Sequence, residues 1–139
     1  MIWRKIEDRY LLRLDVGDGV IESVKDFVAE RGIGSGVISG IGGVTGVVLG
    51  YYDLAAKEYR KRELEGIYEM LSLVGNVSFL GDEPFVHAHA VVSGADMAAM
   101  GGHLFSATVA VTAELYLWAS SIRVTRSLDE RVGLNTLDI

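Results

Sequence analysis

Three histidines are the residues of this chain whose type and spacing could do chemistry. His87, His89 and His103 are its only histidines, they fall within 17 positions, and Gly101-Gly102 directly precedes the third. We expect this glycine pair to be a flexible approach that lets the backbone come close to a ligand. Alternate strand side chains point the same way, about 7 Å apart, so His87 and His89 can turn toward one ion. Three imidazoles with an open water position are typical of catalytic zinc sites. The spacing therefore predicts a site for zinc or another divalent metal, or for a small ligand. The alternative is three structural histidines bonded to backbone carbonyls.

The distance from His89 to His103 is an obstacle to a shared ion. A simple hairpin of residues 85–93 and 103–119 would place His103 opposite Ser93, four residues and roughly 13 Å of strand from His89. That separation is at the limit of what two histidines can bridge through one ion. We therefore expect that the intervening loop folds back, that the two strands are not neighbours, or that a second subunit supplies the third ligand.

Two glutamates lie in apolar surroundings. Glu69 falls in the segment 67–71 and Glu114 in the segment 112–116, so we expect both to be buried. A buried carboxylate needs a partner, which makes each a candidate catalytic residue or, equally, a structural hydrogen-bond acceptor for backbone or arginine. The chain has no cysteine and no Gly-x-Ser-x-Gly motif, so no hydrolase nucleophile is indicated. The catalytic residues, and whether the protein is an enzyme, stay open.

The elements that position these side chains are mostly strands. Apolar residues recur at helical spacing after Asp18, which can cap a helix that ends at Gly32. The glycine-dense segment that follows lacks the spacing of a phosphate-binding loop and predicts two strands with a turn at Gly42-Gly43. The expected strands are 9–16, 36–41, 44–53, 58–64, 67–80, 85–93, 103–119 and 122–126. One helix and about eight strands predict an α+β fold with a mainly antiparallel sheet or open barrel and one main helix.

Composition limits the classes of partner. The 139 residues are half hydrophobic, as in one globular domain spanning 1–139, and the formal net charge is -6. This charge disfavours attraction to nucleic acid, and we interpret the basic segment 57–62 as a solvated hairpin. The most apolar segment, 104–119, is shorter than the roughly 20 residues of a membrane span and contains Glu114. We expect no membrane partner, and a cytoplasmic protein because the N-terminus resembles no signal peptide.

Several segments together resemble the plant- and prokaryote-conserved (PPC) domain. They are Gly66-Ile67-Tyr68-Glu69-Met70-Leu71-Ser72-Leu73, Pro84-Phe85-Val86-His87-Ala88-His89, Gly101-Gly102-His103-Leu104 and the strand pair ending in Leu49-Gly50-Tyr51-Tyr52-Asp53. The likeness covers nearly the whole chain, in order. It implies an α+β fold that assembles as a trimer, and in plants a module that follows AT-hook segments in nuclear DNA-binding proteins. Prokaryotic relatives are often stand-alone domains described as predicted DNA-binding proteins, some with a metal near the histidines.

The resemblance assigns residues as well. It implies that His87, His89 and His103 form the family's histidine motif and that Glu69 is the acidic residue of its Gly-Arg-Phe-Glu motif. Ile67 stands in place of the arginine of that motif, and the chain has no Arg-Gly-Arg-Pro core of an AT-hook. The plant mode of minor-groove binding is therefore not expected.

Two functions follow as expectations. The first is a stand-alone trimeric PPC-like domain that binds a divalent metal or a small ligand at His87, His89 and His103. The second is a DNA-binding or protein-interaction module related to the plant AT-hook proteins. The acidic balance predicts that any DNA binding is weak and salt-sensitive.

Overall fold

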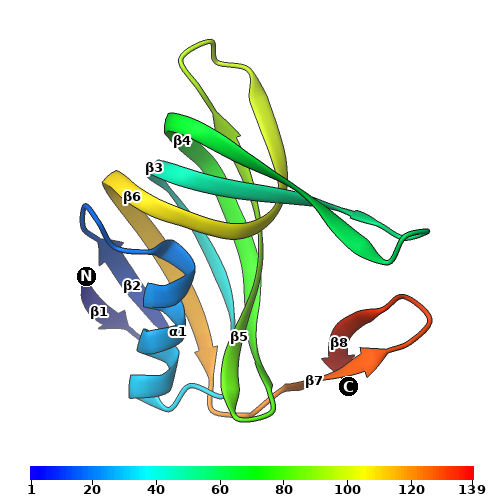
Figure 1. Ribbon diagram of the computed structural model, residues 1–139. Coiled ribbons are helices and arrows are strands. Elements are labelled where there is room, and N and C mark those ends of the chain that lie inside the picture. The colour runs from blue at the N-terminus through cyan, green and yellow to red at the C-terminus, as the bar shows by residue number, and fades with distance from the viewer.

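One helix and eight strands make up the fold (Figure 1), and the computed structural model describes all residues 1–139. The elements are β1 (Ile2–Ile6), β2 (Arg9–Leu14), α1 (Val20–Arg31), β3 (Ser35–Asp53), β4 (Glu58–Leu80), β5 (Glu83–Ser93), β6 (Ala99–Ser120), β7 (Thr125–Asp129) and β8 (Leu134–Asp138). The short strands β1 and β8 were not expected from the sequence. The last expected strand, 122–126, lies at 125–129 instead.

Four long strands form a closed set of ladders. β3 pairs with β4 and β6, and β5 pairs with the same two strands. The β1–β2 hairpin extends the sheet from β6, and the β7–β8 hairpin is joined to β4 by one parallel bridge between Phe79 and Thr125. Every other ladder is antiparallel, which confirms the mainly antiparallel sheet with one main helix. Strands hold about 70% of the residues, so the α+β class fits only loosely.

The expected turn at Gly42-Gly43 is wrong. β3 runs through both glycines without a break, and the positive φ lies at Gly46, at 58°, beside a register shift. A Cβ atom at Gly42 would lie 2.5 Å from the Thr112 carbonyl oxygen, so this glycine allows close strand approach rather than a turn. β4 likewise continues through Gly66, where two strands were expected. Register shifts of this kind bend and twist long strands. Figure 1 shows the end of the β3–β4 hairpin, residues 47–64, leaving the body of the sheet, and we call this segment the arm.

The helix covers the inner face of the sheet beside β5 and β6. Its buried stripe, Val20, Ile21, Val24, Phe27 and Val28, is the expected helical pattern. Burial of each such side chain stabilises the fold by about 1.5–3 kcal/mol. The helix is too short and too polar to cross a membrane.

The two ends of the helix compare differently with the sequence prediction. At the C-terminus, Gly32 adopts the left-handed conformation with φ 62°, as expected. At the N-terminus, Gly19 is the cap residue, and the expected capping by Asp18 is wrong. The Asp18 carboxylate instead accepts a hydrogen bond from the Asp15 backbone N–H at 2.9 Å.

Candidate metal-binding site

The three histidine rings lie together at the junction of β5 and β6. Their centroids are 5.3 Å apart for His87 and His89, 5.3 Å for His87 and His103, and 5.4 Å for His89 and His103. One ring nitrogen from each histidine can be chosen so that all three lie within 4.8 Å of one another. A single chain therefore brings together the three histidines that the sequence singled out.

The register of the β5–β6 ladder brings His89 and His103 closer together than a simple hairpin of the expected strands would. β6 begins at Ala99 rather than at 103, so the connecting loop is only 94–98 and His103 is directly opposite His89. The simple hairpin with His103 opposite Ser93 does not form, because Ser93 pairs with Ala99 and the two strands are neighbours in a different register. His87 lies two residues before His89 on the same side of β5. No second subunit is needed to complete the group.

Glycines around the histidines allow strands to approach closely. Gly101 and Gly102 belong to β6, and neither has a positive φ, so they are not the flexible approach expected from the sequence. A Cβ atom at Gly102 would lie 2.7 Å from the Gly50 carbonyl oxygen, and one at Gly75 would lie 2.3 Å from the His87 carbonyl oxygen. Larger residues at these positions would push apart the strands that carry the rings.

Burial keeps two of the imidazoles neutral at physiological pH. Desolvation, with smaller contributions from the charges of His87, His89 and Lys61, lowers the pKa of His103 to about 4. Desolvation also lowers the pKa of His87, followed by the charges of Arg126 and His89. Neutral imidazole is the form that binds metal. The Nδ1 atom of His103 is buried and has no hydrogen-bond partner, which is unusual for a buried polar atom and fits a ligand position.

A pocket of about 180 Å³ adjoins His87 and His103. The rings of Tyr59 and Phe105 contact the His103 ring, with centroids 4.9 and 4.6 Å away, and the Arg126 side chain reaches the His87 side of the pocket. Sequence reasoning missed Tyr59, Phe105 and Arg126. Tyr59 and Arg126 come from strands that are distant in the sequence from the histidines, and no local pattern marks them. Phe105 lies two residues after His103 on β6, so strand alternation could have placed it on the same side.

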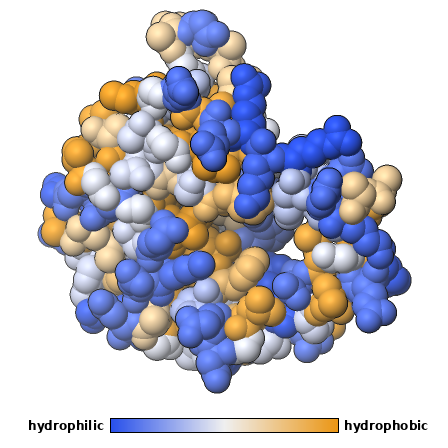
Figure 2. All heavy atoms as spheres, viewed as in Figure 1, coloured by the Kyte–Doolittle hydropathy of each residue, from blue (hydrophilic) through white to orange (hydrophobic).

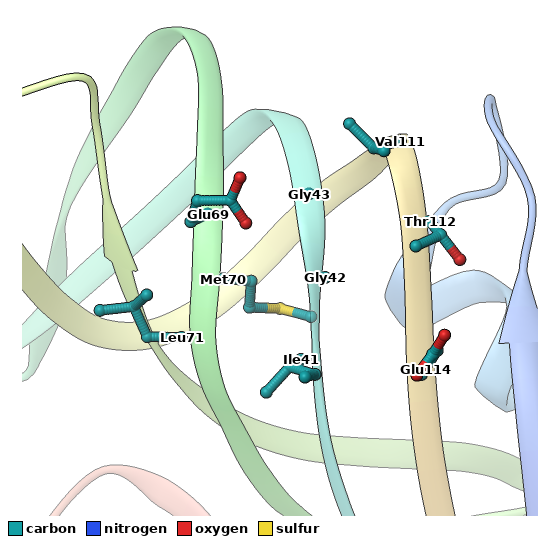
Figure 3. Close-up of a pocket in the computed structure, with 9 residues that line it drawn as sticks. All are labelled: Ile41, Gly42, Gly43, Glu69, Met70, Leu71, Val111, Thr112 and Glu114. Atoms are coloured by element: carbon teal, nitrogen blue, oxygen red, sulfur yellow. The ribbon is translucent and has the colours of Figure 1, made fainter. Parts of the chain in front are cut away.

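The two glutamates lie in a different cleft, and the expectation that they are buried is wrong. Glu69 on β4 and Glu114 on β6 are exposed and flank a cleft of about 380 Å³ above β3 (Figure 3). Across β3, Glu69 is paired with Gly43 and Glu114 with Ile41, so the side chain of Ile41 lines the cleft while Gly42 and Gly43 leave the rest of the space open. The apolar residues directly beside them, Met70, Ala113 and Leu115, are buried, but they alternate with the glutamates along the strands, so the glutamates point to the opposite, exposed face. Neither glutamate joins the histidine group, so any catalytic role of theirs belongs to this cleft.

Solved structures with the same fold come from bacteria and archaea. A metal-containing protein from Archaeoglobus fulgidus is 40% identical, with a TM-score of 0.87 over 98% of this chain and 97% of the other. A plant- and prokaryote-conserved (PPC) protein from Pyrococcus horikoshii is 32% identical, with a TM-score of 0.88 over 99% and 95%. A "putative dna binding protein" from Bacteroides thetaiotaomicron is 28% identical, with a TM-score of 0.94 over 99% and 96%.

The sequence comparisons agree with the resemblance seen in the motifs. No curated protein is similar enough to match the chain. The family model of the Plants and Prokaryotes Conserved (PCC) domain matches residues 3–121, which is most of the chain. The chain therefore belongs to the Plants and Prokaryotes Conserved (PCC) domain family.

Proposed function

We propose that this protein binds a divalent metal ion, with zinc as the first candidate, through His87, His89 and His103. The observation that carries the proposal is the convergence of three ring nitrogens within 4.8 Å in the absence of any carboxylate. Zinc–nitrogen bonds of about 2.0–2.1 Å in tetrahedral geometry place ligating nitrogens roughly 3.4 Å apart. Metal binding would therefore draw the three nitrogens closer together than the 4.8 Å limit, by rotation of the side chains.

The chemistry of the donor set favours zinc. Neutral imidazole suits zinc, copper, iron and nickel, whereas magnesium and calcium prefer oxygen ligands. Three protein ligands leave a fourth position for water or for a ligand atom. The unpartnered Nδ1 atom of His103 supports metal binding over a purely structural role, since a structural histidine at this depth would have a hydrogen-bond partner. The 40% identical relative from Archaeoglobus fulgidus is described as metal-containing.

The deciding experiment measures the metal directly. The protein is stripped with a chelator, reloaded with zinc, dialysed, and analysed for metal by mass spectrometry. We expect one zinc ion per chain, with an affinity high enough to survive dialysis. Zinc content that stays below one-tenth of an ion per chain would refute the proposal. Glu69→Gln is the matched control, because that carboxylate lies in the other cleft and its loss leaves zinc binding unchanged.

We further propose that the protein assembles as a homotrimer, as the family resemblance implies. The outer face of the sheet around the glutamate cleft supports assembly. Ile41, Ile67 and Val111 on β3, β4 and β6 are 56%, 63% and 61% exposed. Apolar side chains that gather on one sheet face are typical of surfaces covered by another protein surface.

Association with DNA is the second candidate function. The relative from Bacteroides thetaiotaomicron carries that description, and this chain gathers Lys57, Arg60, Lys61 and Arg62 on its arm. Figure 2 shows hydrophilic residues concentrated where the arm projects. Acidic residues are interleaved with the basic ones, and Arg60 forms an ion pair with Asp53. These features support weak, non-specific contact at most.

A further inference from the structure

Arg126 is a buried cation without an anion. Its side chain on β7 is 9% exposed, and it forms no salt bridge with any carboxylate of the chain. Charged side chains are almost never buried this deeply unless they are paired. The cost of desolvating this guanidinium is therefore only partly offset by the protein itself.

The hydrogen bonds of Arg126 leave part of its donor fork free. Nε donates to Ser78 Oγ, Nη1 to the Asn135 carbonyl oxygen and Nη2 to Asn76 Oδ1, each at 2.8 Å. A guanidinium has five N–H donors, and these three bonds leave one on each terminal nitrogen. The remaining N–H of Nη2 is directed at His87, so the N–H of Nη1 is the donor left without a protein partner. Nη2 also lies 3.5 Å from Nδ1 of His87, which places the fork against the histidine group. All of its protein partners are neutral.

The pocket beside the Arg126 guanidinium is lined mainly by apolar side chains. Tyr59 from the arm, Phe85 from β5, Phe105 from β6 and Leu134 from β8 line its volume of about 180 Å³. The Phe85 ring lies 5.0 Å from the guanidinium carbon of Arg126. This volume lies below the roughly 300–1,000 Å³ of sites for drug-sized ligands, so the pocket suits only a small molecule, such as one with a single ring.

Two hydrogen bonds hold the pocket open between the arm and the β7–β8 hairpin, which project on the same side of the molecule (Figure 1). The Tyr52 hydroxyl donates to the Val132 carbonyl oxygen at 2.5 Å, and Lys57 Nζ donates to the Glu130 carbonyl oxygen at 2.6 Å. They tie the arm to the turn of that hairpin. The pocket is therefore built before any ligand arrives.

The charged side chains that line or adjoin the pocket are all positive. Arg126 lines it, Lys61 lies 4.0 Å from the Phe105 ring centroid, and no Asp or Glu is among its lining residues. A divalent ion on the three histidines would add two further positive charges. In a protein with net charge -6, this is a local concentration of uncompensated positive charge. Such a site favours an anion.

We propose that this pocket binds a small organic carboxylate, with Arg126 and the metal on the carboxylate group and the aromatic residues around its apolar body. The proposal rests on the proposed function for the role of the metal, but the Arg126 contact stands without it. The free N–H of the guanidinium can donate a charge-assisted hydrogen bond to one carboxylate oxygen, and the positive charge of Arg126 favours the anionic form of the ligand. The apolar walls favour an organic acid over inorganic phosphate, which has no apolar body to bury.

The test compares two probes of the same shape and different charge. Benzoate and benzamide are titrated calorimetrically into zinc-loaded wild-type protein whose zinc content is measured on the same sample. We expect benzoate to bind about 10- to 100-fold more tightly than benzamide, because hydrogen bonds between charged groups are the stronger ones. Equal affinities, or no heat from benzoate at millimolar concentration in a zinc-loaded sample, would overturn the inference. Tighter binding of inorganic phosphate than of benzoate would overturn the assignment to an organic acid.

Substitutions distinguish the contribution of Arg126 to benzoate binding from the contributions of the metal and of the aromatic side chains. Arg126→Gln should lose the preference for benzoate over benzamide, whereas Arg123→Gln, which changes an exposed arginine near it in the chain, should keep it. Arg126 joins three strands, so folding of the variant is checked by circular dichroism. Tyr59→Ala gives an independent test and should weaken the binding of benzoate about 10-fold relative to that of acetate.

A sample that takes up no zinc refutes the proposed function alone, because benzoate should still bind the metal-free pocket, more weakly, through Arg126. Equal benzoate and benzamide affinities there would refute the inference.

Discussion

His89 and His103 are direct partners across the β5–β6 ladder, with ring centroids 5.4 Å apart. Side chains that face each other across an antiparallel pair have Cβ atoms about 4.5–5.5 Å apart. The backbone therefore sets the separation of these two rings, and His87, on the same side of β5, completes the group. This pair is the rigid part of the proposed metal site.

Removal of His89 should abolish tight zinc binding with little effect on folding. His89 is the exposed member of the group, so His89→Ala should change the free energy of unfolding of the metal-free protein by less than about 0.5 kcal/mol. Its zinc affinity should fall at least about 100-fold, since loss of even an indirect partner costs 10- to 100-fold. Chelator competition measures the affinity. Unchanged zinc affinity in this variant would mean that the histidines are structural.

The stability of the metal-free protein should fall between pH 6.5 and pH 4. The pKa of His103 is about 4 in the folded state, and its ordinary value of 6.5 applies to the unfolded chain. Below pH 6.5 the unfolded state binds this proton first, so acidification favours unfolding until the folded state also binds it near pH 4. Urea unfolding at pH 7.5, 6.0 and 5.0 measures the slope. His103→Gln should show a smaller slope, and identical slopes in the two proteins would contradict the assignment.

Close approach of β3 and β6 depends on Gly102. Gly102→Ala should destabilise the fold by about 1–3 kcal/mol and weaken zinc binding, because the new Cβ atom would lie 2.7 Å from the Gly50 carbonyl oxygen. Gly94→Ala is the matched control, since its closest new contact is the Tyr68 side chain at 3.3 Å. Denaturant midpoints compare the two. Equal midpoints would show that the strands relax freely at Gly102.

Light scattering should give a mass of three times 15.1 kDa if the outer sheet face is the subunit interface. Ile67→Asp should then shift the protein to monomers without unfolding it, because the side chain is 63% exposed in one chain. Ile122→Asp, at a residue that is 72% exposed outside this face, should leave the mass unchanged. A wild-type monomer at micromolar concentration would refute the trimer.

Duplex DNA should bind no more tightly than about 10⁻⁴–10⁻⁶ M at physiological salt, the range of non-specific contact. The physical reason is the net charge of -6 together with the acidic residues beside the basic arm. A gel-shift titration with unrelated duplexes measures this affinity. Nanomolar retention of one sequence at about 0.15 M salt would contradict the prediction.

The sequence alone predicted the features that depend on local spacing. The helix that ends at Gly32 follows from apolar residues at helical intervals, and the shared side of His87 and His89 follows from the alternation of a strand. The mainly antiparallel class follows from the succession of strands around a single helix. The motifs also led to the correct family. These features require no knowledge of which strand pairs with which.

Only the tertiary structure decided which residues meet. The start of β6 at Ala99 placed His103 opposite His89, and the path of β4 turned Glu69 outward. Arg126 reaches the histidine pocket through contacts with residues of β4 and β8 that no local pattern relates to it. The physical reason is that strand register is set by long-range pairing and by shifts at glycines, where one residue of slip moves every side chain to the other face.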